Sequence, residues 1–374
     1  MTETRRSNLD GNRIRTESTR TSAPSLASLP AHALPVTFYL AGEPDLARVE
    51  RLDPDVDLDD FRIGERSWVA QTYLRLRAAG YPATLSSKVP ARGLVVFHAK
   101  HKHFLARDIA TSRRIYFVAV RADNSSPLLA DFEIVQSGHF ADERTRFWIP
   151  LWPQAGLLRR NPDRGAKLAR VAYFGRAENL HSAFRGAEWR DALADLGLEW
   201  VFREVSYNRG EPAGADRAKR ACGEGVDWED YRSIDAIVAV RPHEPHLQFA
   251  KPASKLINAW RAGVPALIGP EFASRELRRS TEDYFEVASA AEALAVLRRL
   301  RDDPLLYART VAAGARRTHD FDEAVLTQRW ARVLFDLSPG RVAEGALPWT
   351  RRLPLVLRLP LRRCLRLLRA SRSR

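Results

Sequence analysis

Short apolar runs alternate with helix-like segments along the first half of the chain. Between the first two runs, residues 68–79 place apolar side chains near helical spacing and stop at Gly80, which is typical of a helix C-terminus. Buried strands that alternate with helical or irregular segments favour a parallel sheet with crossover connections. Four runs have the length of buried strands: residues 35–42, 93–98, 114–120 and 131–136.

The same rhythm restarts in the second half, after a Pro- and Trp-rich stretch at residues 147–153 and a basic stretch at residues 159–170. This shift in composition predicts a domain boundary, and the repeated rhythm predicts an α/β protein of two tandem Rossmann-like, doubly wound domains with flexible basic tails. The predicted strands are 170–174, 199–205, 234–240 and 265–269, and the predicted helices are 187–196 and 254–262. The predicted division is a disordered tail at 1–30, domains at 31–155 and 156–340, and a basic Leu/Arg tail at 341–374.

Composition narrows the class of protein. With 374 residues, 45% of them apolar, the chain is long enough for two cores. Of the formal charge of +14, nine charges lie after residue 344 and two before residue 31, which leaves +3 for residues 31–344. The nearly neutral core argues against nucleic acid as a partner. Two distant cysteines and no apolar run of membrane-spanning length favour a cytoplasmic protein without a disulfide framework.

The segment 241–277 carries the clearest chemistry. A predicted strand ends at Arg241, a loop leads to Lys251, and Pro252 precedes Ser254 and Lys255 at the start of the next helix. In doubly wound sheets, ligands bind beyond the carboxyl ends of the strands, and a helix start offers free N–H groups to phosphate. This segment therefore predicts an anion site. Glu271, in the turn after the following strand, is expected to face the same cleft.

Residues 251–269, KPASKLINAWRAGVPALIG, resemble the segment "helix, A-x-x-x-G-x-P, short strand" in the C-terminal domain of glycosyltransferases with the GT-B fold. The resemblance covers residues 169–337 and implies that this half binds a nucleotide-sugar donor and the N-terminal half the acceptor. It places Gly175 and Arg176 in the phosphate-facing loop after the domain's first strand. It also implies donor contacts from Arg241, Lys251, Ser254, Lys255, Asn258 and Glu271.

The match departs from the family at one point. Many retaining members carry two Glu seven residues apart around this helix, whereas this chain has Asn258 at the second position and Ala250 or Lys251 near the first. Retention or inversion is therefore not assigned. Each donor residue also has a structural alternative. The lysines and arginines could be solvated surface residues, and Glu271 could cap the helix that follows it.

The N-terminal half offers two candidate catalytic bases for an acceptor hydroxyl, His98 at a strand end and Asp123 after the next strand. His98 could instead be structural, and Asp123 could cap a turn. His101 and His103 are only weak support for a metal site, because no Cys or carboxylate lies at ligand spacing from them. Trp148 and Trp152 could stack on a sugar or pack at the domain junction.

The predicted function is metal-independent transfer of a sugar from a nucleotide-sugar, a substrate and not a cofactor, to a glycan, lipid-linked or polysaccharide acceptor. The rivals are a GT-B-fold sugar-nucleotide epimerase and a non-catalytic membrane-surface binding protein. Residues 345–374 contain nine Arg and no acid, and residues 360–369 could form an amphipathic helix. They predict an anionic membrane surface as a partner, with a disordered tail or a helix packed on the core as alternatives.

Overall fold

The computed structural model of this chain describes residues 29–61, 64–102, 105, 114–204, 228–242, 251–353 and 355–372. Almost all of the predicted tail at residues 1–30 and the loop predicted at 210–225 lie outside the described residues, as does His103.

The first sheet has six parallel strands in the order β2-β1-β3-β4-β5-β6. The four strands predicted from apolar runs, β1, β3, β4 and β5, form its centre. Of these, β3 and β4 pair along their whole length, from Gly93 with Ile115 to His98 with Val120. Its strands are β1 (Val36–Tyr39), β2 (Ala83–Ser86), β3 (Gly93–His98), β4 (Ile115–Val120), β5 (Phe132–Val135) and β6 (Arg146–Trp148).

The second sheet has five parallel strands in the order β11-β10-β9-β7-β8. The order reverses between β9 and β7, so the chain leaves the sheet in opposite directions on the two sides of that point, where doubly wound sheets bind ligands. Its strands are β7 (Arg170–Gly175), β8 (Glu199–Glu204), β9 (Ala236–Ala239), β10 (Ala266–Ile268) and β11 (Phe285–Glu286).

Helices cover both sheets, and their ends follow the sequence signals. Gly263 ends α7 in the left-handed conformation at φ 74°, and Asp303 caps α10, in which Pro304 is the first residue. The main helices are α1 (Leu46–Arg51), α2 (Gln71–Ala78), α4 (Ala187–Asp195), α7 (Ser254–Ala262), α8 (Phe272–Leu277), α9 (Ala290–Asp302), α10 (Pro304–Thr318), α11 (Glu323–Arg332), α12 (Ser338–Ala343) and α13 (Leu355–Arg372).

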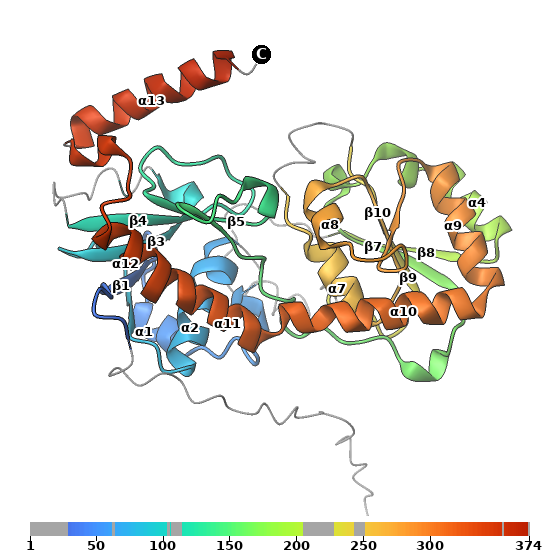
Figure 1. The fold of residues 1–374 in the computed structure, drawn as a ribbon. Coiled ribbons are helices and arrows are strands. Elements are labelled where there is room, and N and C mark those ends of the chain that lie inside the picture. Colours follow the sequence, from blue (N-terminus) through green and yellow to red (C-terminus); the bar gives the residue numbers. More distant parts are fainter. Residues whose placement is uncertain are drawn as a thin grey trace, which may run out of the picture.

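The chain crosses back to the first sheet near its end. In Figure 1, α10 runs along the second sheet and α11 continues beneath the first. Leu326 and Trp330 of α11 are fully buried in the core of the first sheet, together with residues of α2. The second sheet has its own core, built around β7, β9, β10 and α7. The predicted end of the second domain at residue 340 stays a prediction. Residues of α11, which lie before that boundary, pack with the first sheet.

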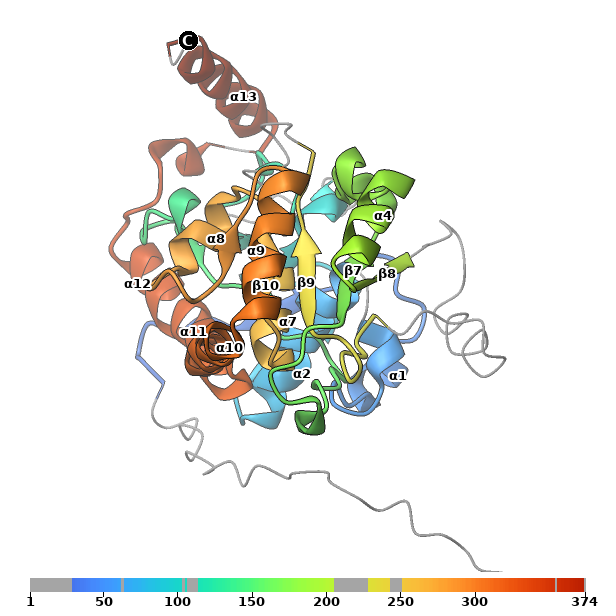
Figure 2. The ribbon, with the colours of Figure 1, turned by 90° about the vertical axis from the view of Figure 1, so that its right-hand side faces the viewer.

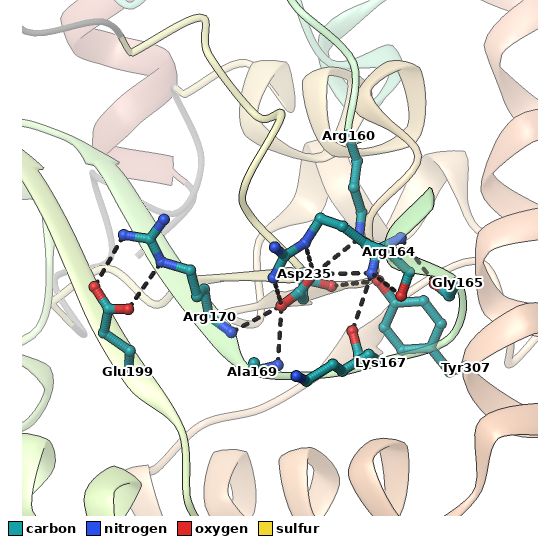
Figure 3. A network of polar contacts seen from close by, with 9 residues as sticks. All are labelled: Arg160, Arg164, Gly165, Lys167, Ala169, Arg170, Glu199, Asp235 and Tyr307. Carbon is teal, nitrogen blue, oxygen red and sulfur yellow. Dashed lines mark hydrogen bonds and ion pairs between the residues drawn. The ribbon is translucent and has the colours of Figure 1, made fainter. Parts of the chain in front are cut away.

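A buried aspartate fixes the amino ends of the second sheet (Figure 3). Asp235, immediately before β9, accepts hydrogen bonds from the backbone N–H groups of Ala169 and Arg170 at 2.9 Å, where β7 begins. Arg160 and Arg164 also donate to its carboxylate. Burial opposes ionisation of Asp235, but Arg164 and the backbone donors outweigh it, so the pKa lies below its usual range. One acid therefore joins the start of β9 to the start of β7.

Three strands were not predicted. β2, β6 and β11 are two to four residues long and lie at or beside the sheet edges, where a run is too short to give a pattern. The predicted junction at residues 147–153 accordingly begins inside β6. The C-terminal segment also differs from a flexible tail, because α13 begins at Leu355, five residues before the predicted helix, and contains Pro360. Its Arg358 is buried beside Asp131.

Candidate donor site in the cleft

The carboxyl edge of the second sheet gathers more cations than acids. Arg241 follows β9, its Nε forms an ion pair with Glu271 Oε1 at 2.8 Å, and both side chains are buried. Lys255, in the first turn of α7, lies with them around a small cavity. Burial raises the pKa of Glu271, although Arg241 and Lys255 oppose that shift. Two cations therefore share one acid, which leaves a net positive charge at this edge.

Lys255 is held out of water against an aromatic ring. Its Nζ lies 5.1 Å from the ring centroid of Tyr173 in β7. Burial, and then the charge of Arg241, lower the pKa of Lys255 to about 7, while Glu271 partly offsets this. An ammonium that is desolvated and repelled by a neighbouring cation gains more from an added anion than an exposed lysine does.

The absence of a side chain at Gly175 leaves space for the ammonium of Lys255. The glycine ends β7 with φ 150°, and a Cβ atom there would lie 3.0 Å from Lys255 Nζ and 3.0 Å from the Tyr173 hydroxyl oxygen. That hydroxyl donates to the carbonyl oxygen of Arg176 at 2.9 Å, which fixes the turn after the strand. A glycine is therefore required both by the backbone conformation and by the close approach.

The start of α7 faces the same edge. Ala253 precedes the helix, no side chain among the described residues caps it, and Ser254 is its first residue. The first N–H groups of a helix have no partner within the helix and attract anions. A phosphate at this point would meet backbone donors, a hydroxyl group and lysine side chains.

Both halves of the chain line a cleft of about 620 Å³. The first half contributes the ends of β3 and β4, and the second half contributes the ends of β7 and β9 and the residues before α7. Six of the ten predicted site residues line this cleft: His98, Asp123, Arg176, Arg241, Lys251 and Ser254. Lys255 and Glu271 lie at the small cavity behind Arg241, so they form the deeper part of the same edge.

An ion pair joins Asp123, a candidate base of the first half, to Lys251 of the second half. Lys251 Nζ lies 2.5 Å from Asp123 Oδ2. Burial raises the pKa of Asp123, but Lys251 outweighs burial and lowers it overall. Burial lowers the pKa of His98 to about 4, so its ring is neutral near pH 7. His98 Nδ1 accepts from the backbone N–H of Lys100 at 3.3 Å, so the proton is on Nε2 and the ring offers a donor.

Several of the predicted residues also make contacts within the protein. Asn258 Oδ1 accepts from the backbone N–H of Gln154, between the two halves, at 3.3 Å. Trp152 is buried and donates from Nε1 to Thr72 Oγ1 at 2.8 Å, which is packing, and Arg329 stacks over Trp148. Glu271 precedes α8 without capping it. Arg176 is half-exposed and pairs with Glu178 at 3.1 Å, at the rim of the cleft.

Sequence reasoning missed the contact that joins the two halves beside the cleft. The carboxylate of Glu276 in α8 accepts from Ser137 Oγ at 2.8 Å and from the backbone N–H groups of Gly138 and His139 at 2.7 and 2.6 Å. The rings of His139 and Phe272 lie 5.1 Å apart in the same contact. No local pattern could signal it, because the partners are about 138 residues apart.

The described residues contain no group of three or more His, Cys, Asp or Glu side chains placed to hold a metal ion. His101 instead pairs with Glu65. None of the described helices is both long enough and apolar enough to span a membrane.

No protein-family profile matches the chain, and no curated protein sequence matches it. Solved structures do. Sucrose-phosphate synthase from Thermosynechococcus elongatus superposes with a TM-score of 0.51 at 13% identity, covering 84% of this chain and 100% of that one. AviGT4, a glycosyltransferase involved in avilamycin A biosynthesis, gives 0.50 at 15%, covering 84% and 99%. TarM gives only 0.45 at 9%, covering 72% of this chain, which spans 59% of TarM.

The likenesses to sucrose-phosphate synthase and AviGT4 identify the fold. Two Rossmann-like domains with parallel sheets and a cleft between them form the GT-B fold of glycosyltransferases, as the resemblance of residues 251–269 implied.

Proposed function

We propose that this protein transfers a sugar from a nucleotide-sugar donor to a glycan, lipid-linked or polysaccharide acceptor. The observation that carries the proposal is the excess of cations, Arg241, Lys251 and Lys255, around the uncapped start of α7 at the carboxyl edge of the second sheet. The diphosphate of a nucleotide-sugar would balance the excess positive charge at this edge. The GT-B fold and the matching residues 251–269 support the same class of ligand.

In the proposed reaction, an acceptor oxygen attacks the anomeric carbon while the bond from that carbon to the diphosphate oxygen breaks. The diphosphate leaves with the electron pair, and Arg241, Lys251, Lys255 and the N–H groups of α7 stabilise the charge that develops on it. These groups are fixed before the reaction begins, so little reorganisation accompanies bond cleavage. The scheme uses no metal ion.

The acceptor proton passes to Asp123 in this proposal. Asp123 lines the cleft beside Lys251 and is ionised near pH 7, because Lys251 lowers its pKa. His98 is the weaker candidate base, since its Nδ1 already accepts a hydrogen bond and its Nε2 carries a proton. We assign His98 the role of a hydrogen-bond donor to a sugar oxygen.

The proposal also includes a place in the cell. We place the protein in the cytoplasm, attached to an anionic membrane surface through residues 345–374, where a lipid-linked acceptor would be within reach. The charge of that segment supports this attachment, because it has nine Arg and no acid.

A thermal-shift screen against UDP-, GDP-, ADP-, CMP- and dTDP-sugars tests the donor site, because a ligand that binds the folded state raises the melting temperature. We expect one nucleotide class to stabilise the wild type and to lose this effect in Lys255→Met. Lys167→Met is the matched control, since Lys167 is an exposed lysine at the opposite edge of the same sheet. No shift with any donor, or equal shifts in both variants, would contradict the proposed site.

Product analysis separates the rival functions. Incubation with the stabilising donor and a panel of acceptors is expected to release the nucleoside diphosphate in an acceptor-dependent manner. An epimerase would instead give an isomer or a free sugar without any acceptor, and a non-catalytic protein would bind the donor without turnover.

A further inference from the structure

The last helix uses one of its faces to hold itself to the first domain. Arg358, Arg362 and Arg366 follow each other at intervals of four in α13, so they lie along one stripe of the helix. Arg362 donates to the carbonyl oxygens of Leu128 and Ala130, at 3.0 and 2.9 Å. Arg366 donates to the carbonyl oxygen of Ser126 at 2.7 Å. This inner stripe therefore lies along the chain that leads into β5.

Asp131 anchors the base of the helix. Its carboxylate is fully buried, and it accepts a hydrogen bond from the backbone N–H of Phe117 in β4 at 3.1 Å. Arg351, Arg358 and Arg362 lie 3.4, 3.6 and 3.3 Å from it. Burial lowers the pKa of Arg358 to about 10, so it is still a cation at neutral pH. The anchor sets the direction in which the helix leaves the domain.

The opposite stripe of the helix has a different character. Leu357 and Leu367 are 57% and 63% exposed, and Pro360, Arg363 and Cys364 lie between them and are exposed as well. Seven large apolar side chains of the described chain are strongly exposed, and four of them lie between residues 349 and 368. Exposed leucine is therefore concentrated in the last helix and is not scattered over the surface.

Both views of the molecule show how α13 lies relative to the two sheets. In Figures 1 and 2, α13 stands clear of the layers that cover the two sheets. A helix packed for stability alone would turn its leucines inward and its arginines toward water. Here the arginines of the inner stripe contact the protein, and although Leu359 packs on the first domain, Leu357 and Leu367 face outward. The arrangement fits an environment in which exposed leucine is favourable.

We infer that α13 docks the protein on an anionic lipid bilayer through its outer stripe, Leu357, Pro360, Arg363, Cys364 and Leu367. Residues 345–374 hold nine Arg and no acid, so the charge of the segment complements anionic headgroups while the leucines enter the boundary of the acyl chains. The inference deepens the membrane attachment in the proposed function and rests on it. Donor binding lies in the cleft and is measured separately, so either can fail alone.

Vesicle co-sedimentation of the full-length protein tests the inference. We expect about tenfold stronger partitioning onto phosphatidylcholine vesicles that contain about 30% phosphatidylglycerol than onto phosphatidylcholine alone, and weaker partitioning at 1 M salt. The double variant Leu357→Gln, Leu367→Gln should bind the anionic vesicles about tenfold less well. The control Leu305→Gln removes a leucine that is 71% exposed on α10, and it should bind as the wild type does.

A second measurement locates the docked surface. Cys364 is exposed, and Cys222 is the only other cysteine, so a polarity-sensitive dye can be attached to Cys364 in a Cys222→Ser background. The emission should shift to the blue with anionic vesicles and stay unchanged with neutral ones. Three results would overturn the inference: no binding to anionic vesicles, equal binding by the leucine variants, or binding without a change at Cys364. Unchanged melting temperatures establish that the variants are folded.

Discussion

Asp235 and Lys255 lie at opposite edges of the second sheet, and both are charged groups withdrawn from water. Asp235 has two arginines and two backbone N–H groups around its carboxylate (Figure 3). Lys255 has an aromatic ring, a neighbouring cation and a single acid that Arg241 already binds. The first arrangement satisfies its charge from within the fold, and the second leaves a charge for a ligand to satisfy. Burial alone therefore does not identify a binding site.

The largest effect on stability is expected at the amino edge of the second sheet, where Asp235 is paired within the fold. Asp235→Asn removes the charge that compensates Arg160 and Arg164 and weakens the contacts that begin β7 and β9. We expect the free energy of unfolding to fall by about 3–5 kcal/mol, as for other buried ion pairs that lose one partner. Urea denaturation measures the change. A loss below about 1 kcal/mol would mean that this edge is not held by its acid.

The residues of the candidate site form a local pattern in the sequence, whereas Asp235 and Glu276 do not. Arg241, Lys251, Ser254 and Lys255 lie within fifteen residues of each other, so strand, loop and helix start give a local pattern. The central strands are likewise continuous apolar runs. Asp235 and Glu276 act on residues 65 to 139 positions away, and nothing near them in the chain signals it. Asn258 was predicted by alignment with a motif, but its hydrogen bond to Gln154 depends on how the two halves meet.

Lys255→Met should change stability in the opposite direction to Asp235→Asn. The substitution keeps a long apolar stem beside Tyr173 and removes a desolvated ammonium, so the free energy of unfolding should rise or stay level. Affinity for the nucleotide-sugar should fall at least tenfold, or about 1.4 kcal/mol, in calorimetry. Lys167→Met, at the other edge, should change neither quantity. Unchanged donor affinity in Lys255→Met would remove this residue from the site.

The pH dependence sharpens the same contrast. Because burial holds the pKa of Lys255 at about 7 in the folded protein, against an ordinary value of 10.5, the unfolded chain binds more protons between these two values. The destabilisation is fully present below pH 7, and stability should rise with pH above it relative to Lys255→Met. A donor diphosphate needs the ammonium, so wild-type affinity should fall by up to about tenfold per pH unit above pH 7. Lys255→Met should show a flat profile in calorimetry at several pH values.

The smallest effect concerns the ion pair across the cleft. Lys251 and Asp123 are both partly exposed, and the carboxylate holds an ammonium that a donor phosphate would also attract. Exposed pairs are worth about 0.2–1 kcal/mol, so Asp123→Asn should strengthen donor binding by up to about fivefold. The rate of transfer should fall at the same time, because the proposed base is lost. If donor affinity falls instead, Asp123 positions Lys251 for the donor and does not compete for it, and the carboxylate belongs to the donor side of the cleft.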